Sequence, residues 1–276
     1  MSQFTVLQCL NSQIHLGHKP SEWNPNIASF LLGYRDNNDT ANEANHIFDV
    51  SKSCWYLRRA LRFASHTAIN LGSEGTSNIL FMGKSPKKIG SLIKKNNPYE
   101  QILKTSALSV GASCFNGDAD TWVNGTFTNW QEYLLQNQNK LIKNSNNTEN
   151  NVRLLDKYTP GSFERQYQKY VRSADNLNQL TPDKDAPTST TDRTQQLINS
   201  RLSLPSLIFA IGISGLEQPL REAHKAGIPI IAVVDSDSNP KIQNQWIDYI
   251  IPGNDDSIRS YAFFCSVISQ AIKEGQ

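Results

Sequence analysis

Short apolar runs that alternate with helical segments constrain the fold of this 276-residue chain more than any other feature. Most of these runs are continuous and do not alternate between apolar and polar residues, which is the pattern of strands buried on both faces. The five runs are residues 46–50, 78–83, 206–211, 229–235 and 247–251. The alternation of strand and helix predicts an α/β fold, a doubly wound sheet of parallel strands.

Helix signals lie between and after these runs. Residues 53–71 open with Ser53, a residue whose hydroxyl can cap a helix, and end at Gly72. Residues 216–226 end at Gly227, and residues 256–273 close the chain. These three segments are predicted to be helices that cover the sheet.

The pattern changes between residues 131 and 202, where the chain becomes polar and rich in Asn and Gln. Residues 131–142 and 192–202 can each form a helix, so this part is predicted to be an inserted helical hairpin with flexible segments. Residues 1–130 and 203–276 would then form one α/β domain around the insertion.

Composition excludes several classes of protein. A net charge of +2 gives no global field for nucleic acid, and no apolar run approaches the roughly 18 residues of a membrane span. The four cysteines form no Cys-x-x-Cys pair, so they are predicted to be reduced, packing thiols. Positive charge is instead local, in two acid-free clusters: Lys84, Lys87, Lys88, Lys94 and Lys95, and Arg58, Arg59 and Arg62.

Residues 122–130 bring together two indoles, side-chain amides and hydroxyls around Gly125, without any acid, base or metal ligand. Such a surface is suited to binding and not to reaction, because amides and hydroxyls bond phosphate or ribose and indoles stack or pack. In the alternative interpretation, Trp122 and Trp130 are a buried pair that brackets a turn.

Other motifs point weakly to chemistry. His15 and His18 resemble half a metal site, with Asp235 or Asp237 as further ligands, although such histidines more often bond backbone, pack or touch RNA. Residues 212–215 form a partial dinucleotide loop that lacks the full Gly-x-Gly-x-x-Gly fingerprint. Residues 235–240 are typical of a turn, with a magnesium or catalytic role as the alternative. We therefore predict no catalytic residue, no cofactor and no metal site.

Several blocks along the chain resemble the ribosomal protein S2 family of the small subunit, in the same order and spacing. They cover nearly the whole chain outside the insertion: residues 15–18, 23–25, Gly33 and Arg35, then 79–83, 122–130, 222–223, 227–229, 234–235, 239–240 and 251–259. The resemblance implies a flavodoxin-like sheet with an inserted coiled-coil hairpin. It also implies a place between head and body of the small subunit, in contact with rRNA and with neighbouring proteins.

The chain departs from the family pattern at several points. Thr121 stands where the family has an arginine, Asn124 where it has a second glycine, and Gly212 where it has an acid. Residues 36–45 lengthen a short loop. These departures, the 27 asparagines and an N-terminus without a leader resemble proteins encoded in plant or protist mitochondrial genomes. A mitochondrial ribosome is therefore expected, with a chloroplast or the bacterial cytoplasm as alternatives.

The resulting hypothesis is a non-catalytic component of the small ribosomal subunit, without membrane association or homo-oligomerisation. The residues expected to contact rRNA are Lys19, Trp23, Asn24, Arg35, Lys84, Lys87, Lys88, Lys94, Lys95, Asn124, Thr128 and Asn129. Trp122 and Trp130 are expected to contact proteins. The alternative functions are a nucleotide- or sugar-phosphate-binding enzyme that uses residues 212–215 and Asp235, and a scaffold that binds only protein.

Overall fold

The computed structural model describes residues 4–35, 44–75, 79–84, 97–116, 122, 124–129, 204–239 and 245–276. The predicted insertion at residues 131–202 lies outside the described residues. So do Trp130 and four lysines of the first basic cluster, Lys87, Lys88, Lys94 and Lys95.

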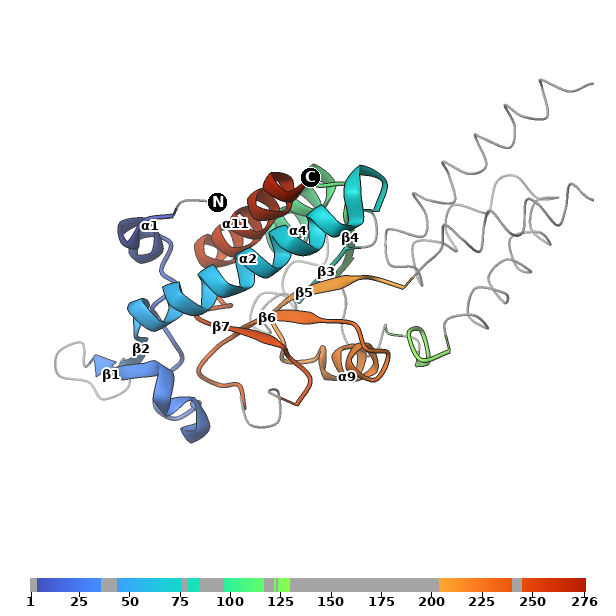
Figure 1. Ribbon diagram of the computed structural model, residues 1–276. Coiled ribbons are helices and arrows are strands. Elements are labelled where there is room, and N and C mark those ends of the chain that lie inside the picture. The colour runs from blue at the N-terminus through green and yellow to red at the C-terminus, as the bar shows by residue number, and fades with distance from the viewer. Residues whose placement is uncertain are drawn as a thin grey trace, which may run out of the picture.

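A five-stranded parallel sheet forms the centre of the molecule (Figure 1). Its strands are β3 (Ile79–Gly83), β4 (Ser113–Asn116), β5 (Leu207–Ile211), β6 (Ile230–Val234) and β7 (Tyr249–Pro252). The strands lie in the order β4-β3-β5-β6-β7, and every adjacent pair is parallel. Counted along the chain this is the order 2-1-3-4-5 of flavodoxin-like sheets, so the predicted parallel, doubly wound arrangement is confirmed.

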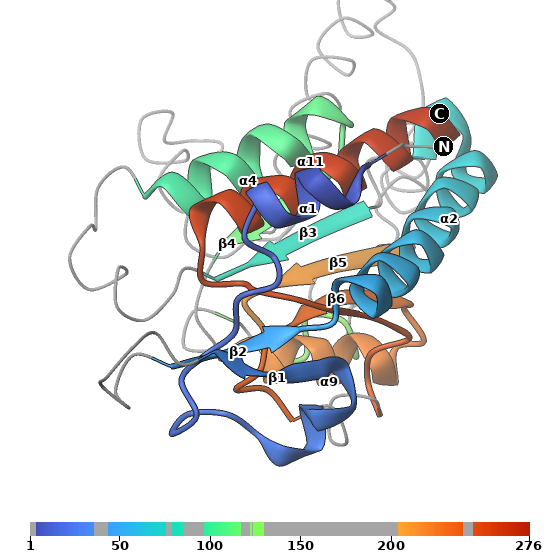
Figure 2. The same cartoon turned by 90° about the vertical axis from the view of Figure 1, so that its left-hand side faces the viewer.

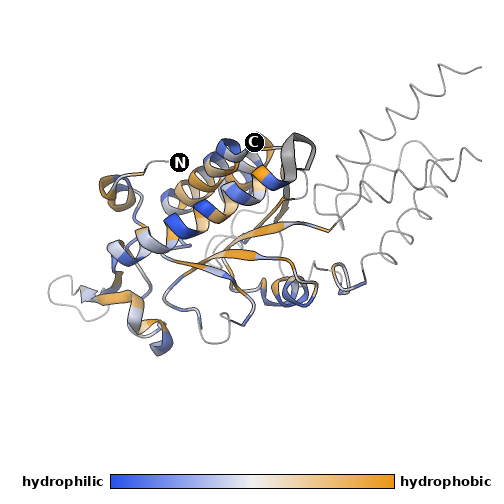
Figure 3. Cartoon of the chain, in the orientation of Figure 1, coloured by the Kyte–Doolittle hydropathy of each residue, from blue (hydrophilic) through white to orange (hydrophobic). Residues whose placement is uncertain are grey.

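Helices cover both faces of the sheet, as a second view shows (Figure 2). One face carries α2 (Val50–Gly75), α4 (Pro98–Ser109) and α11 (Ile258–Gly275), and the other carries α9 (Glu217–Lys225). Strand β5 shows why both faces must be covered: Phe209 packs with the first group, and its neighbours Ile208 and Ala210 pack with the second. When the ribbon is coloured by hydropathy, the central strands are mostly apolar, whereas the helices carry both apolar and polar residues (Figure 3).

The N-terminal part of the chain forms smaller elements beside the sheet. They are α1 (Val6–Asn11), the 3₁₀ helix η1 (Pro25–Phe30), and the strands β1 (Leu31–Arg35) and β2 (Asn45–Phe48). Strands β1 and β2 pair antiparallel in a sheet of their own. The run at residues 46–50 therefore does form a strand, but the prediction that it joins the parallel sheet is wrong. Its burial alternates, with His46 and Phe48 buried, as in a strand with one exposed face.

Helix boundaries differ from the predicted ones mainly at α2. This helix begins at Val50 and is capped by Asp49, whose Oδ1 accepts hydrogen bonds from the backbone N–H groups of Ser51 (3.0 Å) and Lys52 (3.4 Å). Ser53, the predicted cap, is buried inside the first turns, and the helix continues past Gly72 to Gly75. Helix α9 ends as predicted, because Gly227 follows it with a positive φ of 74°.

No helix within the described residues has the length and apolar character needed to cross a membrane.

Candidate functional site

The carboxyl ends of parallel strands meet at one edge of a sheet, which we call the carboxyl edge. Lys84 follows β3, residues 212–215 follow β5, residues 235–239 follow β6, and residues 253–256 follow β7. Ligands of doubly wound proteins bind at this edge. This edge is therefore the place where a ligand site of the enzyme alternative would lie.

The N-terminal segment, defined as residues 14–26, lies against the carboxyl edge and is held there by backbone hydrogen bonds. Asn254 donates its backbone N–H to the carbonyl of Ile14 (3.0 Å), and Asn24 donates to the carbonyl of Ser236 (2.8 Å). The backbone N–H of His18 donates to the Ser236 Oγ (2.7 Å). Gly17 makes this approach possible, because a Cβ atom there would lie 2.8 Å from that same Oγ.

His18 is the charged link between the N-terminal segment and the edge. Its Nδ1 lies 3.2 Å from the Asp235 Oδ1 and its Nε2 lies 3.1 Å from the Asp256 Oδ2. Hydrogen bonding to Asp235, and then to Asp256, raises the pKa of His18 to about 11. The imidazole therefore carries a positive charge at neutral pH, and it joins the loops that follow β6 and β7.

Asp235 is used by the fold itself. Its side chain is 1% exposed, and its Oδ2 accepts a hydrogen bond from the backbone N–H of Asp255 (3.0 Å). The backbone N–H of Ser238 donates to the carbonyl of Asp235 (3.1 Å), which closes a turn. The turn interpretation of residues 235–240 is thus confirmed for the part that the structure describes. Burial, and then the charge of Asp235, raises the pKa of Asp255 well above its usual range.

The metal alternative does not fit the described geometry. His18 does approach Asp235, but as an ion pair, and its protonated imidazole offers no lone pair to a metal ion. Among the residues that the structure describes, no three His, Cys, Asp or Glu side chains are placed to hold one ion.

Four predicted rRNA contacts belong to the N-terminal segment or to β1. Lys19 is exposed, and Trp23 is partly exposed, with its ring tilted by 35° against that of His46 at a centroid distance of 4.6 Å. The side chain of Asn24 caps η1, because its Oδ1 accepts a hydrogen bond from the backbone N–H of Asn26 (3.0 Å). Arg35 ends β1, where it pairs with Asn45. Lys19 and Trp23 thus keep surface for a partner, while Asn24 has an internal task.

The loop at residues 124–129 is tied to α9 by a buried carboxylate. Glu222, which is 7% exposed, accepts hydrogen bonds from the backbone N–H groups of Gly125 (2.9 Å) and Phe127 (3.5 Å). Gly125 has a φ of 88°, a value that glycine adopts without strain. Asn124, Thr128 and Asn129 are exposed on this loop, and the Asn124 Oδ1 accepts a hydrogen bond from the Gln218 Nε2 (3.1 Å).

Trp122 does not have the position expected of a protein-contact residue. It is 7% exposed and packs between the rings of Phe115 (centroids 5.2 Å apart) and Phe127 (5.0 Å). Its indole is part of the core below α9, because a buried aromatic side chain gains more from packing than from exposure. The expectation is corrected: for Trp122 the burial matches the alternative interpretation.

Lys84 occupies the crevice between the carboxyl ends of β3 and β5. A Cβ atom at Gly212 would overlap the Lys84 backbone, and one at Gly215 would overlap the Lys84 ammonium. The start of α9 is also occupied, because the Glu217 Oε2 accepts a hydrogen bond from the backbone N–H of Gly215 (2.9 Å). A phosphate at this helix start would meet a carboxylate, so the geometry disfavours the nucleotide alternative.

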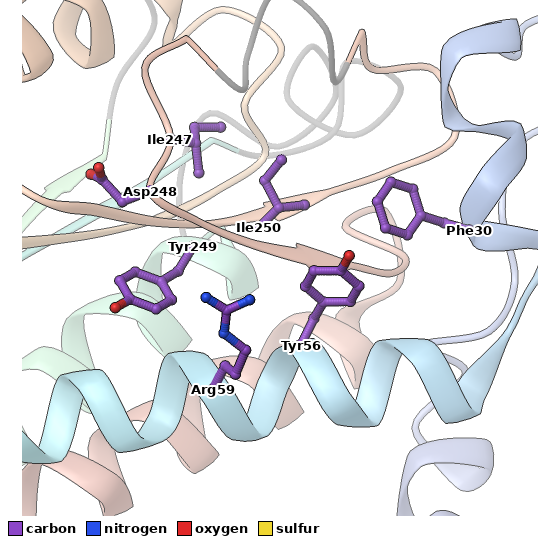
Figure 4. A pocket seen from close by; sticks show the side chains of 7 residues that line it. All are labelled: Phe30, Tyr56, Arg59, Ile247, Asp248, Tyr249 and Ile250. Carbon is purple, nitrogen blue, oxygen red and sulfur yellow. The ribbon is translucent and has the colours of Figure 1, made fainter.

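A groove of about 360 Å³ lies elsewhere, beside the outer strand β7 and α2 (Figure 4). Its walls include Phe30, Tyr56, Arg59 and Tyr249, and the Arg59 guanidinium lies 5.8 Å from the Tyr249 ring centre. The groove is at the amino end of β7, away from residues 212–215 and Asp235. It therefore does not supply the pocket that the enzyme alternative requires.

Sequence reasoning missed two charged anchors, His18 with Asp256 at the carboxyl edge and Glu222 of α9 with the loop at residues 124–129. The sequence indicates a packing or backbone-bonding role for the two histidines, with metal binding as the weaker alternative, but no ion pair with Asp256, and it marks Glu222 only as part of a family block. Nothing in the local sequence signals either contact, because the partners are 238 and 97 residues apart.

Comparisons with known proteins give a consistent answer. A family model described as ribosomal protein S2 matches residues 9–275. The small ribosomal subunit protein uS2 of Brucella ovis is 29% identical over 275 residues, which cover 100% of this chain and 88% of the relative. The uS2 proteins of Afipia carboxidovorans (28% identical, 68% of the relative covered) and Cereibacter sphaeroides (26%, 89%) also match over 100% of this chain.

Proposed function

Because this chain belongs to the ribosomal protein S2 family, we propose that it is a structural, non-enzymatic component of a small ribosomal subunit, and that the subunit is mitochondrial. In this role the chain contacts rRNA and neighbouring ribosomal proteins and catalyses no reaction. It acts as a single copy, without homo-oligomerisation and without a membrane.

The observation that carries the proposal is the way the carboxyl edge is filled. The N-terminal segment covers the loops after β6 and β7, and Lys84 fills the crevice between β3 and β5. Chain segments therefore stand where a doubly wound enzyme binds its ligand. This arrangement suits a protein that presents a fixed shape.

Exposed polar groups of the N-terminal segment and of the loop at residues 124–129 supply the proposed rRNA surface. Lys19, Asn124, Thr128 and Asn129 are exposed, and Trp23 is partly exposed. Ammonium, amide and hydroxyl groups bond phosphate and sugar oxygens, which fixes position with little reading of bases. Arg35, Lys84, Lys87, Lys88, Lys94 and Lys95 complete the proposed surface, and Trp130 with the predicted hairpin is assigned to protein neighbours.

The test replaces two lysines of the basic cluster with alanine, Lys87→Ala and Lys88→Ala. Lys84 stays intact because its side chain packs against Gly215. The double variant should lower occupancy on small subunits about threefold or more, and should flatten the salt dependence of rRNA binding by roughly 0.7 to 0.9 per lost phosphate contact.

The matched control is Lys104→Ala with Lys273→Ala, which removes the same charge from exposed positions on α4 and α11. The control should bind like the unmodified chain. If both double variants co-sediment equally with small subunits, the segment that contains Lys87 and Lys88 does not contribute to rRNA binding.

The mitochondrial assignment is supported by composition, namely the 27 asparagines and the departures at Thr121, Asn124 and residues 36–45. The measurement is organelle fractionation of the source cells, followed by detection of the chain in small-subunit fractions. Recovery from mitochondrial particles is the expected result, and recovery from chloroplast or cytoplasmic particles alone would contradict the assignment.

A further inference from the structure

Two cysteines that are far apart in sequence meet between α1 and α2. The Cys9 Sγ lies 3.7 Å from the Cys54 Sγ, and both residues are free thiols. Cys9 is fully buried and Cys54 is 5% exposed. The other two cysteines, Cys114 and Cys265, are not in a disulfide.

The surroundings make the two thiols chemically different. The hydrogen bond with Cys9, opposed by burial and assisted by the positive charge of Arg58, lowers the pKa of Cys54 to about 7. Arg58 lies one helical turn after Cys54 on α2. The same contact raises the pKa of Cys9 above its usual range. Cys54 is therefore the thiol that ionises first, and thiolates are the reactive form.

The shape of α1 allows the two sulfurs to approach each other. A disulfide bond is about 2.05 Å long, so the sulfurs must move about 1.7 Å closer. Helix α1 has six residues, of which Cys9 is buried, while Val6, Leu7 and Leu10 are 55%, 66% and 40% exposed. A helix this short and this weakly buried opens locally at low cost, which also gives a reagent access to Cys54.

We propose that Cys9 and Cys54 form a reversible dithiol–disulfide modification site that reacts with small disulfides of the oxidised glutathione type. The Cys54 thiolate attacks one sulfur of the reagent, whose S–S bond breaks and releases one thiolate. Cys9 then loses its proton and attacks the Cys54 sulfur of the mixed disulfide, which releases the second thiolate. The two protein thiols are oxidised, and one reagent disulfide is reduced to two thiols.

The bond would fasten α1 to α2 and thereby fix the exposed apolar residues of α1 in one orientation. It would close a loop between residues 9 and 54, which restricts the unfolded chain. The oxidised chain should therefore unfold at a temperature higher by about 5 °C or more.

The test is incubation of the purified, folded chain with oxidised glutathione at pH 8, followed by peptide mapping without reduction. A Cys9–Cys54 peptide should appear and should be lost after treatment with dithiothreitol. The Cys9→Ser variant should stop at glutathione on Cys54, and the Cys114→Ser variant should still form the Cys9–Cys54 bond.

The same chain in denaturant shows that the reagent is competent. The proposal is overturned if Cys9 and Cys54 stay free in the folded chain while the denatured chain is oxidised. It is equally overturned if Cys54 of the folded, unmodified chain retains glutathione with Cys9 free, because the second thiol then does not reach the first.

Discussion

The N-terminal segment and the loop at residues 124–129 are each tied to the α/β core by one nearly buried charged side chain, but the charges are opposite. His18 is a cation between two carboxylates that follow different strands, Asp235 and Asp256. Glu222 is an anion whose partners are backbone N–H groups. The His18 anchor joins the N-terminal segment to the loops after β6 and β7, and both the imidazole and its carboxylate partners can change their charge. The Glu222 anchor joins a single loop to α9 and meets partners that cannot change their charge.

This difference predicts that the two anchors fail differently. Loss of His18 leaves the Asp235 and Asp256 carboxylates without their shared cation. We therefore expect it to destabilise the N-terminal segment and the loops after β6 and β7 together. Loss of Glu222 leaves the backbone N–H groups of Gly125 and Phe127 without their acceptor. We expect this change to destabilise only the loop at residues 124–129.

The largest expected effect is that of His18→Ala. Asp235 is 1% exposed and would lose its cation, which should lower the free energy of unfolding by about 3–5 kcal/mol. Urea denaturation measures the change. The matched control is His66→Ala on the exposed face of α2, where a change within about 0.5 kcal/mol is expected. Equal stabilities for both variants would show that the His18 ion pairs contribute nothing to the fold.

The second effect is that of Glu222→Ala, which should lower the free energy of unfolding by about 2–3 kcal/mol because it removes the acceptor of the Gly125 and Phe127 N–H groups. Glu222→Gln keeps one acceptor and should lose about half as much. Glu100→Ala, at an exposed position in the first turn of α4, is the control.

Hydrogen exchange sharpens the comparison between the two anchors. The Gly125 amide should exchange faster in Glu222→Ala and the Asn24 amide faster in His18→Ala, each without the other. Simultaneous exposure of both amides in either variant would mean that the two regions open as one unit.

The pH dependence of the stability tests the charge of His18. The folded pKa of His18, about 11, lies above its ordinary 6.5, so the stability that it contributes is complete below about pH 6.5 and is lost as the pH rises through about 11. The difference in unfolding free energy between the unmodified chain and His18→Gln should shrink by up to about 1.4 kcal/mol per pH unit across this window. A constant difference from pH 7 to pH 10 would contradict the assigned charge of His18.

The sequence predicted the central part of this fold well, because its strands are buried on both faces. The runs at residues 206–211 and 229–235 are β5 and β6, with boundaries shifted by at most one residue. The side chains of each strand alternate between the two core clusters, so nearly every residue of the strand is apolar. Strand β4 was missed because its four residues, Ser-Cys-Phe-Asn, are too polar and too few to give a pattern. It becomes a strand through pairing with β3.

The candidate site was predictable only in part. Exposed polar residues such as Lys19, Thr128 and Asn129 were recognised by residue type, and the structure places them on the surface. Trp122 was expected at a protein contact because an indole serves both a core and an interface, and composition does not separate the two. The pairing of His18 with Asp256 depends on the sheet bringing distant loops to one edge.

The central claim is that this chain is a fixed part of a small ribosomal subunit. The direct test is gradient sedimentation of the tagged chain from its source cells, with sequencing of the associated RNA. The account predicts that the chain sediments with small subunits and carries their rRNA. A chain that stays in the free-protein fractions, and that gives saturable heat when titrated with nucleotides or sugar phosphates, would contradict it.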